Sequence, residues 1–201
     1  MSVKIFKNGA SNIDQLTDVQ IGGDFDLTNN DILQYKANSG LWINSPTIYT
    51  SGSGTAVAVT GTTETISNYV QIPANFIVDE ATLRFRARVK RVGVAGNVEL
   101  RLYTNTSLSL SGATQMAYYL FPSARTGTIM KRDIYCESIG VNYCVDPTSS
   151  IATDDGSGWA SSTLAIDWSV SRYLIVSVKN VNGADSTTIQ NTIFEAIWSQ
   201  L

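Results

Sequence analysis

The chain has 201 residues, of which 43% are hydrophobic and 15% are charged, and its formal net charge is −3. This length and composition predict one folded domain with a short appendage and exclude a disordered chain. The negative charge argues against a nucleic-acid partner, and the absence of histidine removes the usual general base and the commonest transition-metal ligand, so we expect no cofactor, no metal site and no enzyme other than one working through carboxylates.

Residues 1–45 are predicted to be an N-terminal attachment or trimerisation segment, partly extended and partly a hairpin. The start, MSVKIFKNG, lacks the apolar core of a secretory signal, and no apolar run in the chain reaches the roughly 20 residues of a membrane helix, so we expect no membrane insertion. In DILQYKANSGLWINS, the turn Asn38-Ser39-Gly40 joins two short arms that contain Tyr35 and Trp42. Because a two-stranded hairpin alone is marginally stable, we expect Tyr35 and Trp42 to serve assembly, either on the main domain or with other copies.

Residues 46–201 are predicted to form an all-β domain, an antiparallel β-sandwich of jelly-roll-like type. Apolar residues alternate with polar ones, β-branched and aromatic residues are frequent, and no helical period persists beyond two turns. The predicted strands are residues 55–60, 64–72, 81–91, 97–105, 114–121, 127–136, 163–169, 173–179 and 187–198. Short strands at this spacing are typical of a sandwich.

The predicted strand at residues 81–91 carries a cation at every second position, and we name this set the basic stripe: Arg84, Arg86, Arg88 and Lys90. Apolar side chains occupy the alternate positions, so one face of the strand is core and the stripe points away from it. Three interpretations stay open: the solvent-facing side of a sheet, which the pattern favours, a subunit interface, or a site for an anion or acidic glycan. Since like charges repel, we expect a carboxylate partner on another strand or subunit, and Glu99 on the following strand is a candidate.

The two cysteines, Cys136 and Cys144, flank a predicted turn at Gly140, and a hairpin centred there would place them opposite each other. A cross-strand disulfide is one interpretation, and a pair of free, half-buried thiols is the other. The thiols are favoured, because two cysteines in a chain without an export signal are no disulfide framework.

An acidic, glycine-containing loop, Asp154-Asp155-Gly156-Ser157-Gly158, is followed by Trp159. The loop lacks the spaced ligands of a calcium-binding loop, so an ordinary turn is favoured over a metal site. A small glycan contact made by Trp159, Asp154 and Asp155 is the alternative interpretation, since exposed tryptophan rings bind sugars. Trp168 shares a face with Leu164 and Ile166 and is predicted to lie in the core.

Three stretches, in this order, resemble parts of bacteriophage virion proteins. DILQYKANSGLWINS resembles a short hairpin that recurs in phage tail and fibre proteins ahead of a distal module. IPANFIVDEATLRFRARVKRVGVAGNVELRLYTNTSLSLSGATQMA resembles a β-sandwich module of phage virion proteins, in which a strand is followed by a hairpin, here at residues 93–107. LAIDWSVSRYLIVSVKNVNGADSTTIQNTIFEAIWS is similar to the closing strands of the same modules.

The resemblance implies a non-enzymatic virion structural protein, such as a small tail or head fibre, a tail-tip component or a capsid decoration protein. Such proteins are usually homotrimers that attach to other virion proteins through their N-terminal part, are made in the host bacterial cytoplasm, and in some cases contact host-surface polysaccharide. The alternative function is a carbohydrate-binding module or a carboxylate-dependent glycan hydrolase. The N-terminal hairpin favours the virion protein, because a soluble module has no need of it.

Overall fold

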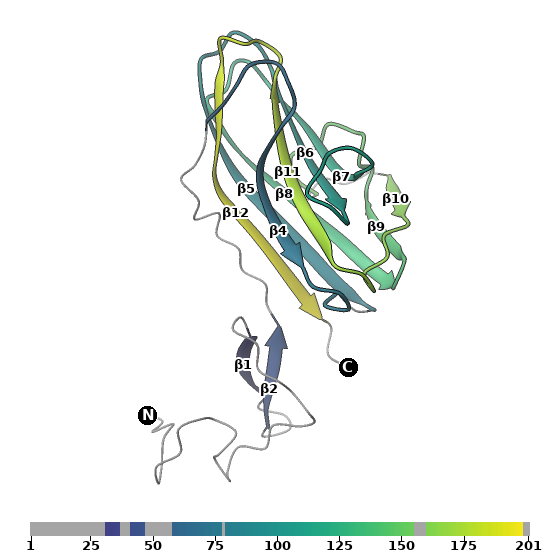
Figure 1. Cartoon of the computed structure of the whole chain (residues 1–201). Coiled ribbons are helices and arrows are strands. Elements are labelled where there is room, and N and C mark those ends of the chain that lie inside the picture. The colour runs from purple at the N-terminus through teal and green to yellow at the C-terminus, as the bar shows by residue number, and fades with distance from the viewer. Residues whose placement is uncertain (1–30, 37–40, 47–57, 78, 155–159, 199–201) are drawn as a thin grey trace, which may run out of the picture. The chain divides into compact units, whose positions relative to one another are not determined.

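The computed structural model describes residues 31–36, 41–46, 58–77, 79–154 and 160–198. Within these ranges the chain forms strands and turns and no helix, so the predicted all-β class is confirmed (Figure 1). The chain divides into two compact units, Met1–Ile48 and Tyr49–Leu201.

The first unit contains one described hairpin. Strands β1 (Asp31–Lys36) and β2 (Leu41–Pro46) pair antiparallel, and their register places Tyr35 opposite Trp42. The two arms that the sequence predicts around residues 38–40 are therefore present and paired.

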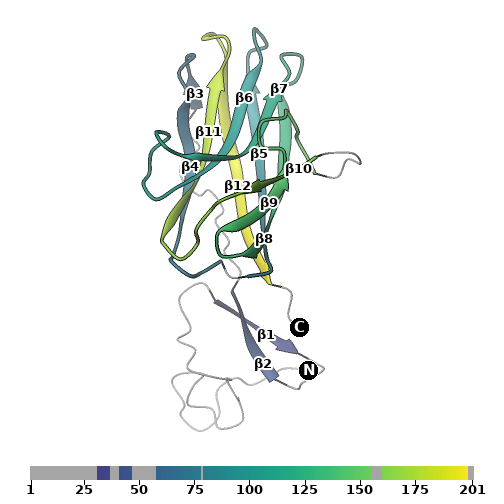
Figure 2. The same ribbon diagram turned by 90° about the vertical axis from the view of Figure 1, so that its right-hand side faces the viewer.

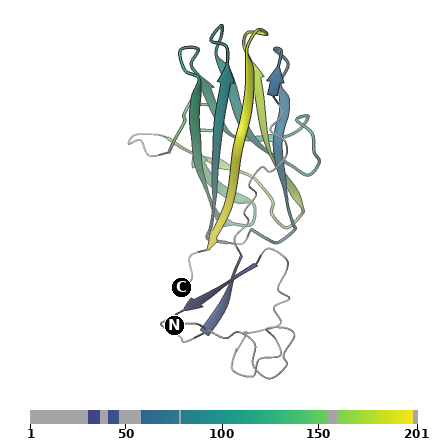
Figure 3. The same cartoon turned by 90° about the vertical axis from the view of Figure 1, so that its left-hand side faces the viewer.

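The second unit is a sandwich of two antiparallel sheets. The six-stranded sheet has the order β10 (Ser161–Leu164), β9 (Val141–Val145), β8 (Gly127–Ser138), β5 (Ala81–Val92), β12 (Ser186–Trp198) and β3 (Ala58–Thr60). The four-stranded sheet has the order β4 (Thr65–Ile72), β11 (Arg172–Asn180), β6 (Val98–Asn105) and β7 (Thr114–Phe121). Figure 3 looks onto the larger sheet, in which β12 (yellow) lies beside β5.

The strand pairing is that of a jelly roll, which confirms the predicted fold type. Each early strand pairs with a late one: β3 with β12, β4 with β11, β5 with β8, and β6 with β7. These four pairs follow one another along a single long antiparallel ribbon. The ribbon is wrapped around the core, so that β12 also pairs with β5 and β11 also pairs with β6. Strands β9 and β10 extend the larger sheet beyond β8. The result is the double-sheet arrangement with eight principal strands that defines the fold.

The core lies between the two sheets and follows from alternation. In β5, Leu83, Phe85, Ala87 and Val89 are buried, and in β6 the buried set is Val98, Leu100 and Leu102. Phe85 also contacts Phe194 of β12, with ring centroids 5.1 Å apart. Both inner faces are apolar, so each sheet covers the other.

The predicted ladder between residues 81–91 and 97–105 is wrong, and so is the hairpin implied at residues 93–107. Strands β5 and β6 belong to different sheets, and the chain crosses from one to the other through residues 93–97. Each of the two strands buries one face, and these faces belong to the opposite sheets that enclose the core. Glu99 consequently lies away from the basic stripe and pairs with Arg101 and Lys179 instead.

The predicted strand at residues 163–169 is wrong after Leu164, where β10 ends and irregular structure begins. The prediction for Trp168 is nevertheless confirmed, because its side chain is only 1% exposed. Its indole Nε1 donates to Asn142 Oδ1 at 2.7 Å, which satisfies the one polar group of the ring in the core.

The cysteines lie on the hairpin formed by β8 and β9, but they do not face each other. A register shift near the turn places Cys136 opposite Asn142 and Cys144 opposite Ile134. Both thiols are free and buried, and burial raises the pKa of each to about 11. The thiol interpretation is therefore confirmed, and the predicted opposition of the two residues is wrong.

One end of the sandwich is tied together by a buried ion pair. Arg91 Nη2 lies 3.5 Å from Asp185 Oδ2, and both side chains are inaccessible to solvent. Arg91 also donates to the backbone carbonyls of Pro122 and Ser123 in the β7–β8 turn, at 3.4 and 3.0 Å. Asp185 accepts the backbone N–H of Ala95 at 3.0 Å. Three inter-strand loops at the end seen uppermost in Figure 2 are thus joined through two side chains.

Candidate functional site: a basic face on the larger sheet

The basic stripe lies on the outer face of the six-stranded sheet. Its strand, β5, runs between β8 and β12. Arg86, Arg88 and Lys90 are exposed and Arg84 is half-buried, while the residues between them point into the core. The division of faces predicted from the alternation is confirmed.

The neighbouring strands decide which cations have partners. Asp133 of β8 and Glu195 of β12 are both opposite Arg84 in the strand register. Their carboxylates lie 3.2 and 3.8 Å from the Arg84 guanidinium. The expected carboxylate partners of the stripe therefore exist on β8 and β12, and among the described residues they pair with one of its four members, Arg84.

The next position along the stripe has a different environment. Arg86 is opposite Lys131 of β8 on one side and Ile193 of β12 on the other. Arg88 faces Ile129 and Asn191 in the same way. In the described part of the chain, no ion pair joins Arg86, Arg88, Lys90 or Lys131 to a carboxylate.

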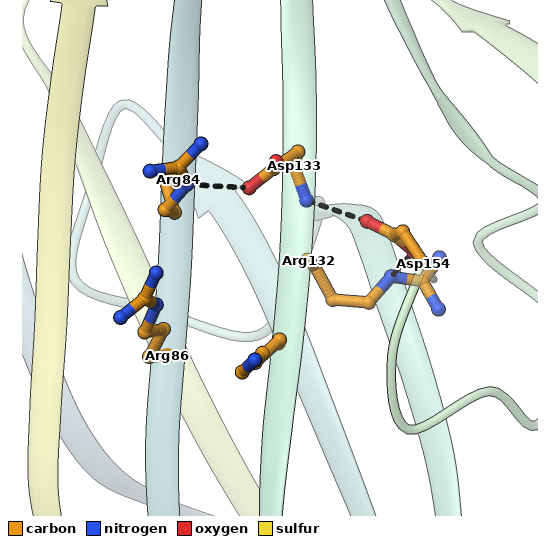
Figure 4. A pocket seen from close by; sticks show the side chains of 6 residues that line it. Arg84, Arg86, Arg132, Asp133 and Asp154 are labelled. Carbon is orange, nitrogen blue, oxygen red and sulfur yellow. Dashed lines mark hydrogen bonds and ion pairs between the residues drawn. The ribbon is translucent and has the colours of Figure 1, made fainter. Parts of the chain in front are cut away.

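A pocket of about 190 Å³ opens where Arg84 and Arg86 meet β8. It is lined by Arg84, Arg86, Lys131, Arg132, Asp133 and Asp154. Figure 4 shows Arg84 and Arg86 on β5, with Asp133 and Arg132 on the adjacent strand and Asp154 beyond them. Four cations and two carboxylates line this space, so its local balance is positive.

Asp154 fixes the far wall of the pocket. Its carboxylate Oδ1 lies 3.0 Å from Arg132 Nε, and its Oδ2 accepts the backbone N–H of Asp133 at 2.5 Å. The segment that carries Asp154 also runs along β8, where the N–H of Lys131 donates to the carbonyl of Ala152 at 2.7 Å. Asp154 therefore anchors its own segment to the edge of a strand.

Arg132 is a buried cation behind the pocket. Its side chain is 0% exposed, and it donates to the carbonyls of Ile151 and Val145 at 3.2 and 2.8 Å. Burial lowers the pKa of its guanidinium, while the charge of Asp154 acts in the opposite direction. The ion pair of Arg132 and Asp154 therefore positions the pocket wall, while the guanidinium charge of Arg132 stays buried.

The remaining predicted site residues are distributed elsewhere. Asp155 and Trp159 lie outside the described residues, so the glycan contact predicted for them with Asp154 stays a prediction. Tyr35 and Trp42 are placed by their backbone register alone, as paired residues of β1 and β2. The assembly role predicted for them also stays a prediction.

Lys131, Arg132 and Asp133 are site residues that sequence reasoning missed. They occur consecutively in the strand predicted at residues 127–136, where alternation places Lys131 and Asp133 on the solvent face. The signal in MKRDI was the placement of Lys131 and Asp133 at alternate positions, but its meaning depends on β8 pairing with β5, and partner choice is not visible in a single strand.

The outer face of the four-stranded sheet carries a second polar cluster, which is internally paired. Glu64 accepts hydrogen bonds from Ser177 Oγ at 2.5 Å and Tyr103 Oη at 3.0 Å, and it lies 3.2 Å from Arg101. Burial opposes ionisation of Glu64, yet these three partners together hold the pKa of its carboxyl below the usual value. Burial and the nearby Glu64 raise the pKa of Tyr103 to about 12. Because these charges are neutralised within the sheet, this face has less attraction for an ionic ligand than the basic stripe has.

The described residues contain neither a cluster of metal ligands nor a membrane-spanning helix. No group of three or more metal-ligating side chains is gathered in these ranges. None of their elements is a helix long and apolar enough to cross a membrane.

No protein-family model matches this chain, and no curated protein matches it either. Several solved structures are similar at a low level, among them the following two. The CBM2 module of the evolved Dit protein of Lactobacillus casei BL23 phage J-1 is 14% identical, over 90% of this chain and 82% of that chain, with a TM-score of 0.34. The structure of infectious bursal disease virus Gx strain is 9% identical, over 85% of this chain and 46% of that chain, with a TM-score of 0.30. This chain thus spans less than half of the viral chain, and likenesses at these scores assign no role to it.

Proposed function

We propose that this chain is a non-enzymatic structural component of a bacteriophage particle, either a small fibre, a tail-tip component or a capsid decoration protein. In this proposal the N-terminal unit attaches to other virion proteins and joins the chain into a homotrimer, and the jelly roll is displayed at the surface. The protein is made in the cytoplasm of the host bacterium and functions in the virion without a cofactor, a nucleic-acid partner or insertion into a membrane.

The observation that carries this proposal is the hairpin formed by β1 and β2. It occurs at the sequence that resembles the phage hairpin, it belongs to a compact unit apart from the sandwich, and its register pairs Tyr35 with Trp42. A two-stranded hairpin needs additional packing to be stable, and self-association is one source of it. The jelly roll adds support at the level of the fold alone, since the same fold serves viral capsids and lectins as well as other functions.

The alternative of a carboxylate-dependent hydrolase has less support at the pocket. Such enzymes place two carboxyl groups on either side of the bond that they cleave. Here Asp133 is held by Arg84, and Asp154 is held by Arg132. We therefore assign both carboxylates to positioning the basic side chains and not to catalysis.

The native mass of the protein, measured by size-exclusion chromatography with light scattering, tests the proposed assembly. The full chain is compared with a shortened chain that begins at Tyr49, which keeps the whole sandwich with its own core. We expect a trimer for the full chain and a monomer for the shortened one. A full-length monomer would contradict the trimer, and a trimer that survives the truncation would move assembly from the hairpin to the sandwich.

A further inference from the structure

The basic stripe differs from an ordinary solvent-facing strand in its pairing. Arg86 and Lys131 are directly opposite each other, and both side chains are exposed. Like charges at opposite positions of an antiparallel pair destabilise the sheet, whereas opposite charges stabilise it. The same sheet satisfies this rule one pair away, where Arg84 faces Asp133. The Arg86–Lys131 position therefore carries a cost that a bound anion would remove.

The other charged residues of the pocket pair with each other, which leaves Arg86 and Lys131 available to bind an anion. The Arg84 and Arg132 guanidinium groups are engaged by Asp133 and Asp154, at 3.2 and 3.0 Å. These contacts hold both carboxylates on the β8 side, so Arg86 and Lys131 are the lining cations without an ion-pair partner among the described residues. An oxyanion entering the pocket would meet charge-assisted donors from both strands.

The positive charge continues beyond the pocket along one line. Arg88 and Lys90 follow Arg86 on the same face of β5, and alternate residues of a strand are roughly 6.6 Å apart. Such a row fits a linear ligand that carries a negative charge at regular intervals. A single small anion would use the pocket and leave the rest of the row unpaired.

The surroundings of the row favour a polysaccharide over a protein or a nucleic acid. Tyr135 and Ile129 are 41% and 53% exposed on the same face of β8, and such side chains can pack against the apolar faces of sugar rings. The centres of protein interfaces are depleted of charged residues other than arginine, whereas this face also carries Lys90 and Lys131. The whole chain has a net charge of −3, which opposes the long-range attraction of a duplex.

We infer that the outer face formed by Arg86, Arg88, Lys90 and Lys131 binds a polysaccharide that carries oxyanions, with one anionic group held between Arg86 and Lys131. This inference deepens the proposed function, since it names the class of host-surface molecule that the displayed sandwich contacts, and it rests on that function for its biological setting. The binding itself is a property of the protein alone.

The test is the affinity of the full-length protein for immobilised polymers, measured by biolayer interferometry at low and at physiological ionic strength. The probes are hyaluronan, whose charges are carboxylates, dextran sulfate, whose charges are sulfates, uncharged dextran, and a DNA duplex. Arg86→Gln and Lys131→Gln each remove one charge from the pocket. Lys179→Gln removes one charge from the outer face of the other sheet and is the matched control.

We expect one or both anionic polysaccharides to bind, dextran not to bind, and the affinity to fall as the ionic strength rises. Arg86→Gln and Lys131→Gln should each weaken binding by about tenfold, and Lys179→Gln should leave it unchanged. Binding to hyaluronan alone would assign the site to carboxylates, and binding to dextran sulfate alone would assign it to sulfates.

Several results would overturn the inference. These are no binding to either anionic polymer at low ionic strength, equal weakening by Lys179→Gln, or equal affinity for the duplex. Self-association that Arg86→Gln abolishes would instead make this face an interface between copies. Because binding and native mass are separate measurements, a failure here leaves the proposed assembly untouched, and a monomeric protein that binds would leave this inference standing.

Discussion

Gly93 and Asp185 meet where β5 leaves the larger sheet. Gly93 has a φ of +90°, and a Cβ atom at this position would come too close to Asp185 Oδ1. Gly96 approaches Asn182 in a similar way, with 2.8 Å left for a Cβ. The backbone can therefore pass close enough for Asp185 to accept the N–H groups of Ala95 and Gly96, at 3.0 and 2.8 Å, while it pairs with the buried Arg91.

Replacing Gly93 by alanine should destabilise the protein more than replacing Gly61 does. Gly61 has nearly the same backbone conformation, with φ of +86°, but nothing lies within 4 Å of an added Cβ. Both substitutions incur the strain of a positive φ, about 1–3 kcal/mol, and only Gly93→Ala also displaces Asp185. Urea denaturation of the two variants measures the difference. Equal losses in the free energy of unfolding would mean that the close contact between Gly93 and Asp185 does not contribute to stability.

At the scale of elements, most strand positions were predictable from the sequence, apart from β9 and the end of β10, and strand partners were not. Alternation is a local property, so β5, β6, β7 and β11 occur within one residue of their predicted ends. Pairing depends on residues far apart in the chain, and the predicted ladder between residues 81–91 and 97–105 failed because β5 and β6 belong to different sheets. For the same reason the stripe was visible in the sequence, whereas the pocket was not: half of its lining comes from β8.

The two carboxylates at the pocket should differ in their contribution to stability. Asp154 pairs with Arg132, which is 0% exposed, so Asp154→Ala would leave a buried guanidinium without its carboxylate and should cost about 1–3 kcal/mol. Asp133 pairs with Arg84 at the surface, where the side chains are 49% and 34% exposed, and Asp133→Ala should cost about 1 kcal/mol or less. Thermal unfolding of both variants measures this contrast. A larger loss for Asp133→Ala would refute the anchoring role given to Asp154.

At the scale of the whole molecule, ionised carboxylates contribute to the stability of the sandwich. Hydrogen bonds from backbone N–H groups, first that of Ala95, lower the pKa of Asp185, and hydrogen bonds also lower the pKa of Asp146 and Asp167. Glu64 has a lowered pKa as well, because its bonds to Ser177, Arg101 and Tyr103 outweigh burial. All four groups therefore bind protons less readily in the folded chain than in the unfolded one.

The resulting pH dependence has a definite sign. A depressed folded-state pKa contributes stability that is present above the unfolded-state values, 3.8 for the aspartates and 4.5 for the glutamate, and that is lost as the pH falls through the folded-state values. We expect the free energy of unfolding to change little between neutral pH and about pH 5 and to decline steadily below pH 4. Urea titrations at a series of pH values measure this profile. Stability that is unchanged down to pH 2 would show that these contacts do not persist in solution.

Membership in a virus particle is what the proposed function predicts most directly. The decisive measurement is the amount of this chain, detected with an antibody against the sandwich, in each fraction of a density gradient of the phage that encodes it. We predict that the chain bands with infectious particles at a constant number of copies per particle and stays with them after washing in high salt. Finding the chain only in the soluble fractions at the top of the gradient would contradict a structural role in the virion.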